Sequence, residues 1–353
     1  MMKKSTETVR RANMISIIRH WALLLCCLTG ATAAMAGDTP NLGTGKDAPK
    51  PAHHEMSLEE MSKKIDNPLS DLWLLWMQND HMKFNGNISS KNQTVNVSYF
   101  EPVLSIPLGK KWNLVNRPVI TRINAQVPTL DLGPLEERLG GLPRGQGLGH
   151  PGSGGIADKL LNNANWDNQS SWGDLVYLAM LSPQTYPTLG NGKLLWGAGV
   201  TTMWPTAGKN EFGTQKYSAG PAGLAMYQGS KWMFGVLAQQ WWSYAGNDDR
   251  ADVSSLDAQY FWFYQLPHLW QIGAAPSITA DWKADSDNRW TVPLGIGVNK
   301  TFRIGQLPIR VSLEVHKTIV QPDDFGQDWN FRLVFIPIIP NMVKVWQGTE
   351  KLP

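Results

Sequence analysis

The stretch RWTVPLGIGVNKTF, residues 289–302, decides the fold class because its alternate side chains form two contrasting sets. Successive side chains of a β-strand point to opposite faces of the sheet. The even positions run from Trp290 to Phe302 through valine, leucine and isoleucine, with one lysine. From Thr291 onward the odd positions hold only threonine, proline, glycine and asparagine. We therefore predict one strand with an apolar face, called the oily face below, and an opposite face of small or polar side chains, called the bare face. The question is which of the two faces the inside of the protein.

Two further segments show the same alternation and place aromatic residues at both ends of the oily face. They are WMFGVLAQQWWSY, residues 232–244, and WQIGAAPSITADW, residues 270–282. Transmembrane barrel strands have this pattern, because an outward apolar band about 25 Å tall is flanked by aromatic girdles. A soluble sandwich would bury its apolar face and would need no tryptophan at both ends of it. The oily face is therefore predicted to point outward to lipid, and the bare face inward to water.

From residue 69 onward the sequence repeats an extended segment followed by a turn. Tight turns such as LGKK and QGSK alternate with longer polar loops such as AGNDDRADV, as in outer-membrane barrels with short periplasmic turns and long outer loops. No apolar run reaches the length of about 18 residues that suggests a spanning helix. The predicted fold is all-β, a transmembrane antiparallel up-and-down β-barrel of about 12 strands, with a short N-terminal helix and both termini in the periplasm. The predicted strands cover about 70–84, 95–108, 111–126, 172–184, 192–206, 215–228, 231–245, 253–266, 269–282, 289–304, 307–321 and 328–340.

Residues 1–36 are predicted to be a signal peptide. A basic start leads into the apolar run WALLLCCLTGATAAMA, which ends in an A-x-A cleavage pattern; an uncleaved anchor is the weaker alternative. Both cysteines of the chain lie in this run, so the mature protein is expected to have no disulfide. Without residues 1–36 the chain holds 27 basic and 28 acidic residues. This balance gives no support for a nucleic-acid partner.

The rest of the chain divides into an arm, the barrel and a tail. Residues 37–67 are predicted to be a periplasmic arm whose short helix, with Ser57 and Glu60 in capping-box spacing, plugs the periplasmic mouth. The barrel is predicted to cover 68–342, with a Gly-rich outer-loop insertion at 127–171, followed by a tail at 343–353. The insertion contains a G-x-G-x-x-G pattern, but no strand precedes it and no βαβ unit surrounds it. A loop that folds over the pore mouth is therefore favoured over a nucleotide site.

Five prolines interrupt the predicted strands. Proline lacks the N–H that a strand ladder needs, so it belongs at edges or bulges. A closed barrel has no edge, and some of these residues are therefore expected to mark bulges or places where a carbonyl is hydrated from the lumen. A half-open sheet is the alternative. The five are Pro102, Pro118, Pro276, Pro293 and Pro337.

Charged residues on the inward faces are the candidate site. Glu101 and Arg117 lie on strands joined by a tight turn and should meet. Membrane-depth charges are normally paired and turned away from lipid. Two interpretations stay open: a constriction that screens solutes by charge and size, or salt bridges that fill a narrow interior. The residues predicted to line the pore are Glu101, Arg117, Arg310, Glu314, His316 and Arg332, with Glu314 and His316 expected to approach Arg332 across the last hairpin.

Catalytic and metal sites gain little support from the sequence. Ser312 and His316 share the inward face but lie roughly 13 Å apart along an extended strand, too far for a Ser–His hydrogen bond. A lipid hydrolase is therefore the least favoured function, no catalytic residue is assigned, and no cofactor or metal is predicted for the barrel. Outer-loop acidic residues could hold divalent cations that bridge lipopolysaccharide, although such residues more often solvate loops; they are Asp248, Asp249, Asp252, Asp285, Asp287, Asp323 and Asp324.

Several long stretches resemble one family of bacterial outer-membrane proteins. They include GDLVYLAMLSP, LLWGAGVTTMWPTA and SAGPAGLAMYQGSKWMFGVLAQQWWSYAGNDDR. The family is related to the meta-pathway phenol-degradation proteins, and its members are often labelled neuromedin-U-like or "transporter". The resemblance covers about residues 67–340, apart from the insertion. It implies an outer-membrane barrel that passes small solutes, hydrophobic or aromatic ones among them, and it brings no catalytic residues.

The leading prediction is therefore an outer-membrane channel for passive, energy-independent passage of small solutes. The expected surroundings are outer-membrane lipid and lipopolysaccharide. A structural or surface-interaction barrel with a filled lumen is the alternative.

Overall fold

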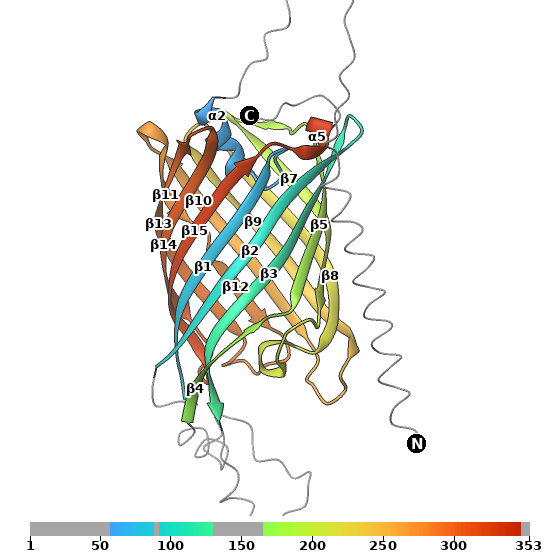
Figure 1. Ribbon diagram of the computed structural model, residues 1–353, viewed down its shortest axis with the longest axis vertical. Helices are drawn as coiled ribbons and strands as arrows, with labels where there is room; N and C mark the ends of the chain where they lie inside the picture. Colours follow the sequence, from blue (N-terminus) through green and yellow to red (C-terminus); the bar gives the residue numbers. More distant parts are fainter. Residues whose placement is uncertain (1–56, 88–91, 130–164, 347–353) are drawn as a thin grey trace, which may run out of the picture. The chain divides into compact units, whose positions relative to one another are not determined.

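The computed structural model describes residues 57–87, 92–129 and 165–346, and these residues form a closed antiparallel β-barrel (Figure 1). The signal peptide, most of the arm, the greater part of the Gly-rich insertion and the end of the tail lie outside the described residues. Within them the sheet closes as 12 barrel strands, which confirms the predicted architecture. Two of the 12 are broken into halves: β4 with β5, both paired to β3, and β11 with β12, both paired to β10.

The strands follow the predicted segments closely, and consecutive barrel strands are neighbours around the ring. In chain order they are β1 (Trp73–Asn85), β2 (Gln93–Leu108), β3 (Trp112–Thr129), β4 (Asn165–Trp172), β5 (Leu175–Pro183), β7 (Gly192–Trp204), β8 (Lys216–Gln228), β9 (Trp232–Gly246), β10 (Ser254–Gln265), β11 (Trp270–Ala274), β12 (Ser277–Asp281), β13 (Trp290–Ile304), β14 (Leu307–Val320) and β15 (Gly326–Ile339). The short β6 (Thr188–Leu189) extends the turn before β7, and β15 pairs with β1 to close the ring. The helices α2 (Leu58–Ile65) and α5 (Met342–Trp346) both lie at the end with the tight turns (Figure 1).

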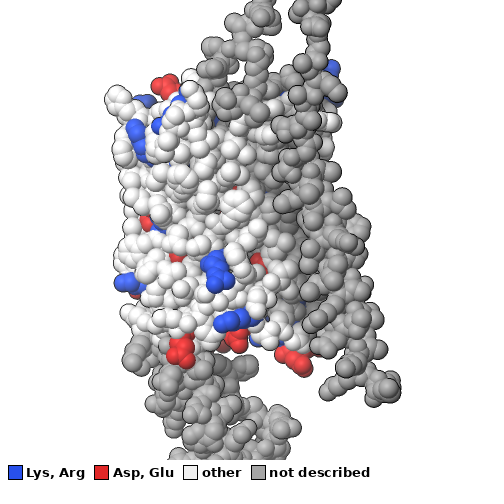
Figure 2. Space-filling model, in the orientation of Figure 1, with Lys and Arg blue, Asp and Glu red and all other residues white. Residues whose placement is uncertain are grey.

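The outer surface of the barrel is apolar. On β13 the even-numbered Leu294 and Ile296 are 55% and 61% exposed, whereas the odd-numbered Asn299 and Thr301 are 2% and 1% exposed. The oily face of this strand therefore points outward, as its alternation predicts. Figure 2 shows mostly uncharged side chains on the visible wall, with charged ones more frequent towards the two ends.

Aromatic pairs lie on the outside near both ends of the wall. At the tight-turn end Trp112 meets Trp196 with ring centroids 6.0 Å apart, and at the opposite end Trp282 meets Trp290 at 5.3 Å. Two aromatic belts around an apolar wall are the arrangement that places a barrel in a bilayer. The described part of the chain therefore has the architecture of a transmembrane β-barrel. No helix in the part of the chain that the structure describes is long and apolar enough to cross a membrane.

The prolines sit where strand pairing is interrupted, and the half-open alternative is wrong because the ring closes. Pro102 and Pro118 both fall in the stretch of the β2–β3 ladder between Phe100↔Ile120 and Leu104↔Asn116 where no pairs form. Two residues that lack a backbone N–H donor thus lie in the same unpaired stretch. The loss of strand hydrogen bonds is therefore confined to one place in the barrel wall.

The other three prolines have separate places. Pro276 lies at the break between β11 and β12, and Pro293 lies at a register shift in the β13–β14 ladder. Pro337 falls in a gap of the β1–β15 ladder. Only Pro293 therefore coincides with a register shift, and the others lie at interruptions that keep the register.

Candidate functional site

The chain enters the barrel through α2, which begins with the predicted capping box. Glu60 N–H donates to Ser57 Oγ at 3.2 Å, and Ser57 N–H donates to the Glu60 carboxylate at 2.9 Å. This reciprocal cap fixes the first turn of an otherwise short helix. Ser62 and Ile65 are the buried residues of the helix and face the barrel interior. We call residues 57–72, which lie between the arm and β1, the plug segment.

The plug segment reaches across the barrel mouth. On one side Gln228 of β8 donates to Lys63 O at 2.8 Å, and the Leu69 side chain lies against Gly197 of β7. On the other side Arg310 of β14 donates to the backbone of α2. β7 and β14 lie far apart around the ring, so these contacts hold the segment across the lumen rather than along one wall.

A buried ion pair anchors the plug segment to the wall. Asp66, just after α2, forms an ion pair with Arg310, and Gln271 Nε2 donates to the same carboxylate at 2.6 Å. Arg310 also donates to Ser62 O at 2.9 Å and to Ser62 Oγ at 3.0 Å. Asp66 and Arg310 are both more than nine-tenths buried. Arg310, predicted to line the pore, is therefore engaged with the plug segment.

A second clamp lies at the rim, outside the strands. Asp71 binds Lys64 at 2.8 Å and also forms an ion pair with Lys344 of α5. Burial acts to raise the pKa of the Asp71 carboxyl, but the hydrogen bonds from Lys344 and Lys64 outweigh it and lower the pKa to about 2. The clamp links the end of α2 to the C-terminal helix α5, a contact that no sequence pattern predicted.

A partly open cavity of about 70 Å³ lies beneath the plug segment inside the barrel. An apolar cavity of about 150 Å³ is large enough for benzene, so the present cavity must widen before it can hold an aromatic solute. Its walls are mainly aliphatic and aromatic, with polar groups from the plug segment, β3, β10, β13 and β14. The lining includes Ile65, Asp66, Pro68, Trp76, Arg117, Phe261, Phe263, Asn299, Arg310 and Glu314.

The structure brings Glu101 and Arg117 together beside this cavity. Arg117 Nε donates to Glu101 Oε2 at 2.9 Å, and both side chains lie inside the barrel. The pair sits at the gap that Pro102 and Pro118 leave in the β2–β3 ladder. The contact between Glu101 and Arg117 could be predicted from the sequence because a tight hairpin joins their strands. Pairing of adjacent strands determines which side chains lie opposite each other on one face.

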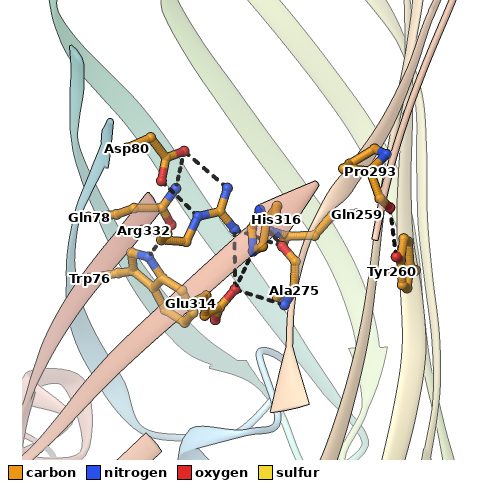
Figure 3. A network of polar contacts seen from close by, with 10 residues as sticks. All are labelled: Trp76, Gln78, Asp80, Gln259, Tyr260, Ala275, Pro293, Glu314, His316 and Arg332. Atoms are coloured by element: carbon orange, nitrogen blue, oxygen red, sulfur yellow. Dashed lines mark hydrogen bonds and ion pairs between the residues drawn. The ribbon is translucent and has the colours of Figure 1, made fainter. Parts of the chain in front are cut away.

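The remaining predicted residues form one buried network, shown in Figure 3. His316 Nε2 lies 2.8 Å from Glu314 Oε2, and Arg332 Nη1 lies 4.0 Å from the same oxygen. Arg332 Nε donates to Asp80 Oδ1 at 2.8 Å and Nη2 donates to Asp80 Oδ2 at 3.0 Å. Asp80 was missed by the sequence analysis. Its signal was a charge on the inward face of β1, beside Gln78.

The same network supports a break in the barrel wall. Pairing of β13 with β11 ends at Ile272↔Val298, and pairing with β12 begins again at Thr279↔Thr291. Between them Ala275 makes polar contacts with side chains instead of with β13. Ala275 N–H donates to Glu314 Oε2 at 3.0 Å, and Ala275 O accepts from Arg332 Nη1 at 2.7 Å (Figure 3).

Room for these side chains comes from glycine on β13. A Cβ at Gly297 would lie 2.7 Å from Glu314 Cγ, and one at Gly295 would lie 2.7 Å from His316 Cδ2. On the lipid side of the break Tyr260 donates to Pro293 O at 2.8 Å (Figure 3). A groove of about 470 Å³ opens there, and Glu314 and Arg332 contribute to its lining. Glu314 also lines the lumenal cavity, so this residue of β14 contributes to the lining of both spaces.

The structure gives no catalytic or metal geometry to the other candidates. His316 bonds to Glu314, two residues away, rather than to a serine. Among residues 57–87, 92–129 and 165–346 no group of three or more His, Cys, Asp or Glu side chains is placed to hold a metal ion. In the outer loops Asn288 bonds to both Asp285 and Asp324. Cation binding by these loops stays a prediction.

Comparisons with known proteins give similar barrels and no family. No protein-family model and no curated protein sequence matches the chain. Among solved structures, an outer-membrane channel from Pseudomonas putida F1 is similar with a TM-score of 0.48 and 17% identity, over 76% of this chain and 93% of that one. A Pseudomonas aeruginosa FadL homologue has a TM-score of 0.36 and 10% identity, over 77% and 90%. Outer membrane phospholipase A from Escherichia coli has a TM-score of 0.33 and 12% identity, over 80% and 98%. No solute or activity is transferred from these proteins to this chain, and the resemblance to the phenol-degradation group stays a prediction.

Proposed function

We propose that the protein is a channel for the passive passage of small apolar solutes, aromatic ones included, across the outer membrane. The observation that carries the proposal is the lumenal cavity, whose aromatic and aliphatic walls are closed on one side by a segment that belongs to no strand. An apolar interior with a few polar groups suits an uncharged, mostly apolar ligand. Glu101, Arg117, Arg310, Glu314, His316 and Arg332 would line the path. No catalytic step is assigned to any residue.

The filled-lumen alternative rests on the ion pairs and on the apolar cluster inside the barrel. Both readings agree that the lumen is narrow in this conformation. They differ in what the plug segment does. Its polar anchors can be released without breaking a single strand pair, because α2 belongs to no strand. A removable stopper is expected in a channel, whereas a purely structural barrel would gain more from bulky side chains on the strands themselves.

The break in the wall favours a sideways route for part of the path. The lumenal cavity and the lipid-side groove share Glu314, and the backbone of β13 has no strand partner between Val298 and Thr291 on that side. An apolar solute loses nothing by moving between the lumen and the hydrocarbon layer, since neither space demands its hydration. Lipid at the wall and lipopolysaccharide at the outer rim are the partners that this proposal implies.

Single-channel recording in a planar bilayer tests the proposal. The full-length mature protein should give small, rare openings, and a variant lacking residues 37–67 should give larger and longer ones. Cells that carry the variant should also take up labelled naphthalene faster than cells with an empty vector. If the variant forms a heat-modifiable barrel yet neither conducts nor speeds naphthalene uptake, the channel assignment is wrong and the structural barrel stands.

A further inference from the structure

The inward face of β13 carries one buried polar side chain that has no hydrogen-bond partner in the described part of the chain. Asn299 is 2% exposed, and neither its Oδ1 nor its Nδ2 has a hydrogen-bond partner among the described residues. Leaving a buried amide unpaired is costly, so such a group calls for a partner. Asn299 lines the lumenal cavity, where that partner can be supplied.

The charged groups around the cavity, and the amide nitrogen of Gln259, already have partners. Arg310 is held by Asp66, and Arg117 is held by Glu101. Glu314 accepts from Ala275 N–H and contacts His316, and Gln259 donates to Ala275 O at 3.2 Å. The cavity thus presents paired charges, the unpaired Asn299 amide and the polar side chains of Gln259 and Ser312 in a wall that is otherwise apolar.

We propose that Asn299 is the polar anchor of a lumenal binding site for an uncharged ligand with an apolar body and a single hydroxyl or carbonyl group. This inference rests on the proposed function and names its solute class. A carboxamide offers both a hydrogen-bond donor and an acceptor, so one ligand hydroxyl can donate a hydrogen bond to Oδ1 and accept one from Nδ2. A charged ligand, such as a carboxylate or an amine, would find no free counter-charge in the cavity, because the arginine and carboxylate side chains around it are already paired with each other.

The surroundings of Asn299 fit a ligand that lies against the aromatic wall. Trp76, Phe261 and Phe263 also line the cavity. Ser312 lies directly opposite Asn299 across the β13–β14 pair. It lines the cavity as well and offers a hydroxyl beside the Asn299 amide. Ile65 and Asp66 of the plug segment form one side, so entry of a ring moves the plug. The anchor is thus placed to hold a ligand while the plug shifts.

A pair of isosteric ligands tests the anchor on the full-length protein in nanodiscs. The probes are 4-fluorobenzyl alcohol and 4-fluoroethylbenzene, which differ in a terminal hydroxyl and a methyl group, with 4-fluorobenzoate as the charged probe. Binding is followed by 19F NMR, and the signal from empty nanodiscs is subtracted. Wild type should bind the alcohol about tenfold more tightly than ethylbenzene, the worth of one or two hydrogen bonds, and should bind benzoate least.

The variant Asn299→Leu should lose the alcohol preference, about tenfold in affinity, and keep its affinity for ethylbenzene. Asn330→Leu is the matched control, because Asn330 is equally buried, also has an unpaired Oδ1, and is not among the cavity-lining residues. Asn299→Ala replaces the leucine variant if that one does not give a heat-modifiable barrel.

Four outcomes would overturn the inference. If wild type binds the alcohol and 4-fluoroethylbenzene equally, or if the folded Asn299 variant keeps the preference, Asn299 is satisfied by water only and the channel proposal survives. If benzoate binds best, the ligand class is wrong. If no probe binds wild type, both this inference and the apolar-solute proposal fail.

Discussion

The Asp66–Arg310 pair gives the sharpest prediction about the plug segment. Asp66→Asn keeps the shape of the side chain and removes its charge. Arg310 then has no carboxylate within ion-pair distance among the described residues. In a soluble core such a change would simply destabilise the fold. Here the helix can leave the lumen and let water reach Arg310, so we expect the plug to open while the barrel stays folded.

The size of the effect follows from the contacts. Removing one partner of a buried ion pair costs about 3–5 kcal/mol. The lower end applies, since the asparagine can still accept from Gln271, and about 3 kcal/mol changes the closed-to-open ratio by roughly 100-fold. Burial of Ile65 and Leu69 opposes release by about 1.5–3 kcal/mol each. The plug should therefore open often and briefly rather than stay open.

Single-channel recording measures this directly. Asp66→Asn should raise the open probability by one to two orders of magnitude with no change in the temperature at which the barrel unfolds in detergent. Glu59→Gln is the control, because Glu59 is an exposed acid on the same helix. Wild-type gating in Asp66→Asn with an intact barrel would refute the reasoning, as would loss of the barrel, since the pair would then hold the wall and not the plug.

Three further perturbations have defined outcomes. Arg332→Leu leaves Asp80 buried without its cation and should destabilise the barrel by about 3–5 kcal/mol, whereas the double variant with Asp80→Leu should recover part of the loss in a detergent unfolding assay; equal loss in both would disprove the pairing energy. Gly297→Ala places a Cβ 2.3 Å from Leu313 O, so the variant should lose about 1–3 kcal/mol of unfolding free energy and admit naphthalene at a changed rate; an unchanged melting temperature would contradict this. The Asp71 carboxyl has a pKa of about 2 in the folded protein, below its ordinary value of 3.8, so its clamp stabilises fully above about pH 4 and weakens as the pH falls towards 2; openings should become more frequent in that window, and Asp71→Asn should abolish the change.

Much of the fold could be predicted from the sequence because its information is local. Alternation along residues 289–302 fixes which side chains face lipid, since the period of a strand is two. Tight turns make successive strands neighbours, so the meeting of Glu101 with Arg117 follows from one hairpin. The contact of Glu314 with Arg332 follows from the last one. The capping box formed by Ser57 and Glu60 likewise predicts where α2 begins.

Closure of the barrel and the path of the plug segment depended on tertiary structure alone. Asp80 meets Arg332 because β1 pairs with β15, a contact between residues 252 positions apart. Asp66 meets Arg310 because α2 turns into the lumen. Neither distance is set by strand periodicity, which describes a residue's face but not its partner from the far end of the chain.

The opening stretch shows the same division. Its sequence decides that Ile296 faces lipid and that Gly297 and Asn299 face inward. Only the folded barrel places Glu314 over Gly297 and leaves Asn299 unpaired beside a cavity. Side-chain direction follows from the local backbone, whereas space and hydrogen-bond partners follow from everything that closes around it.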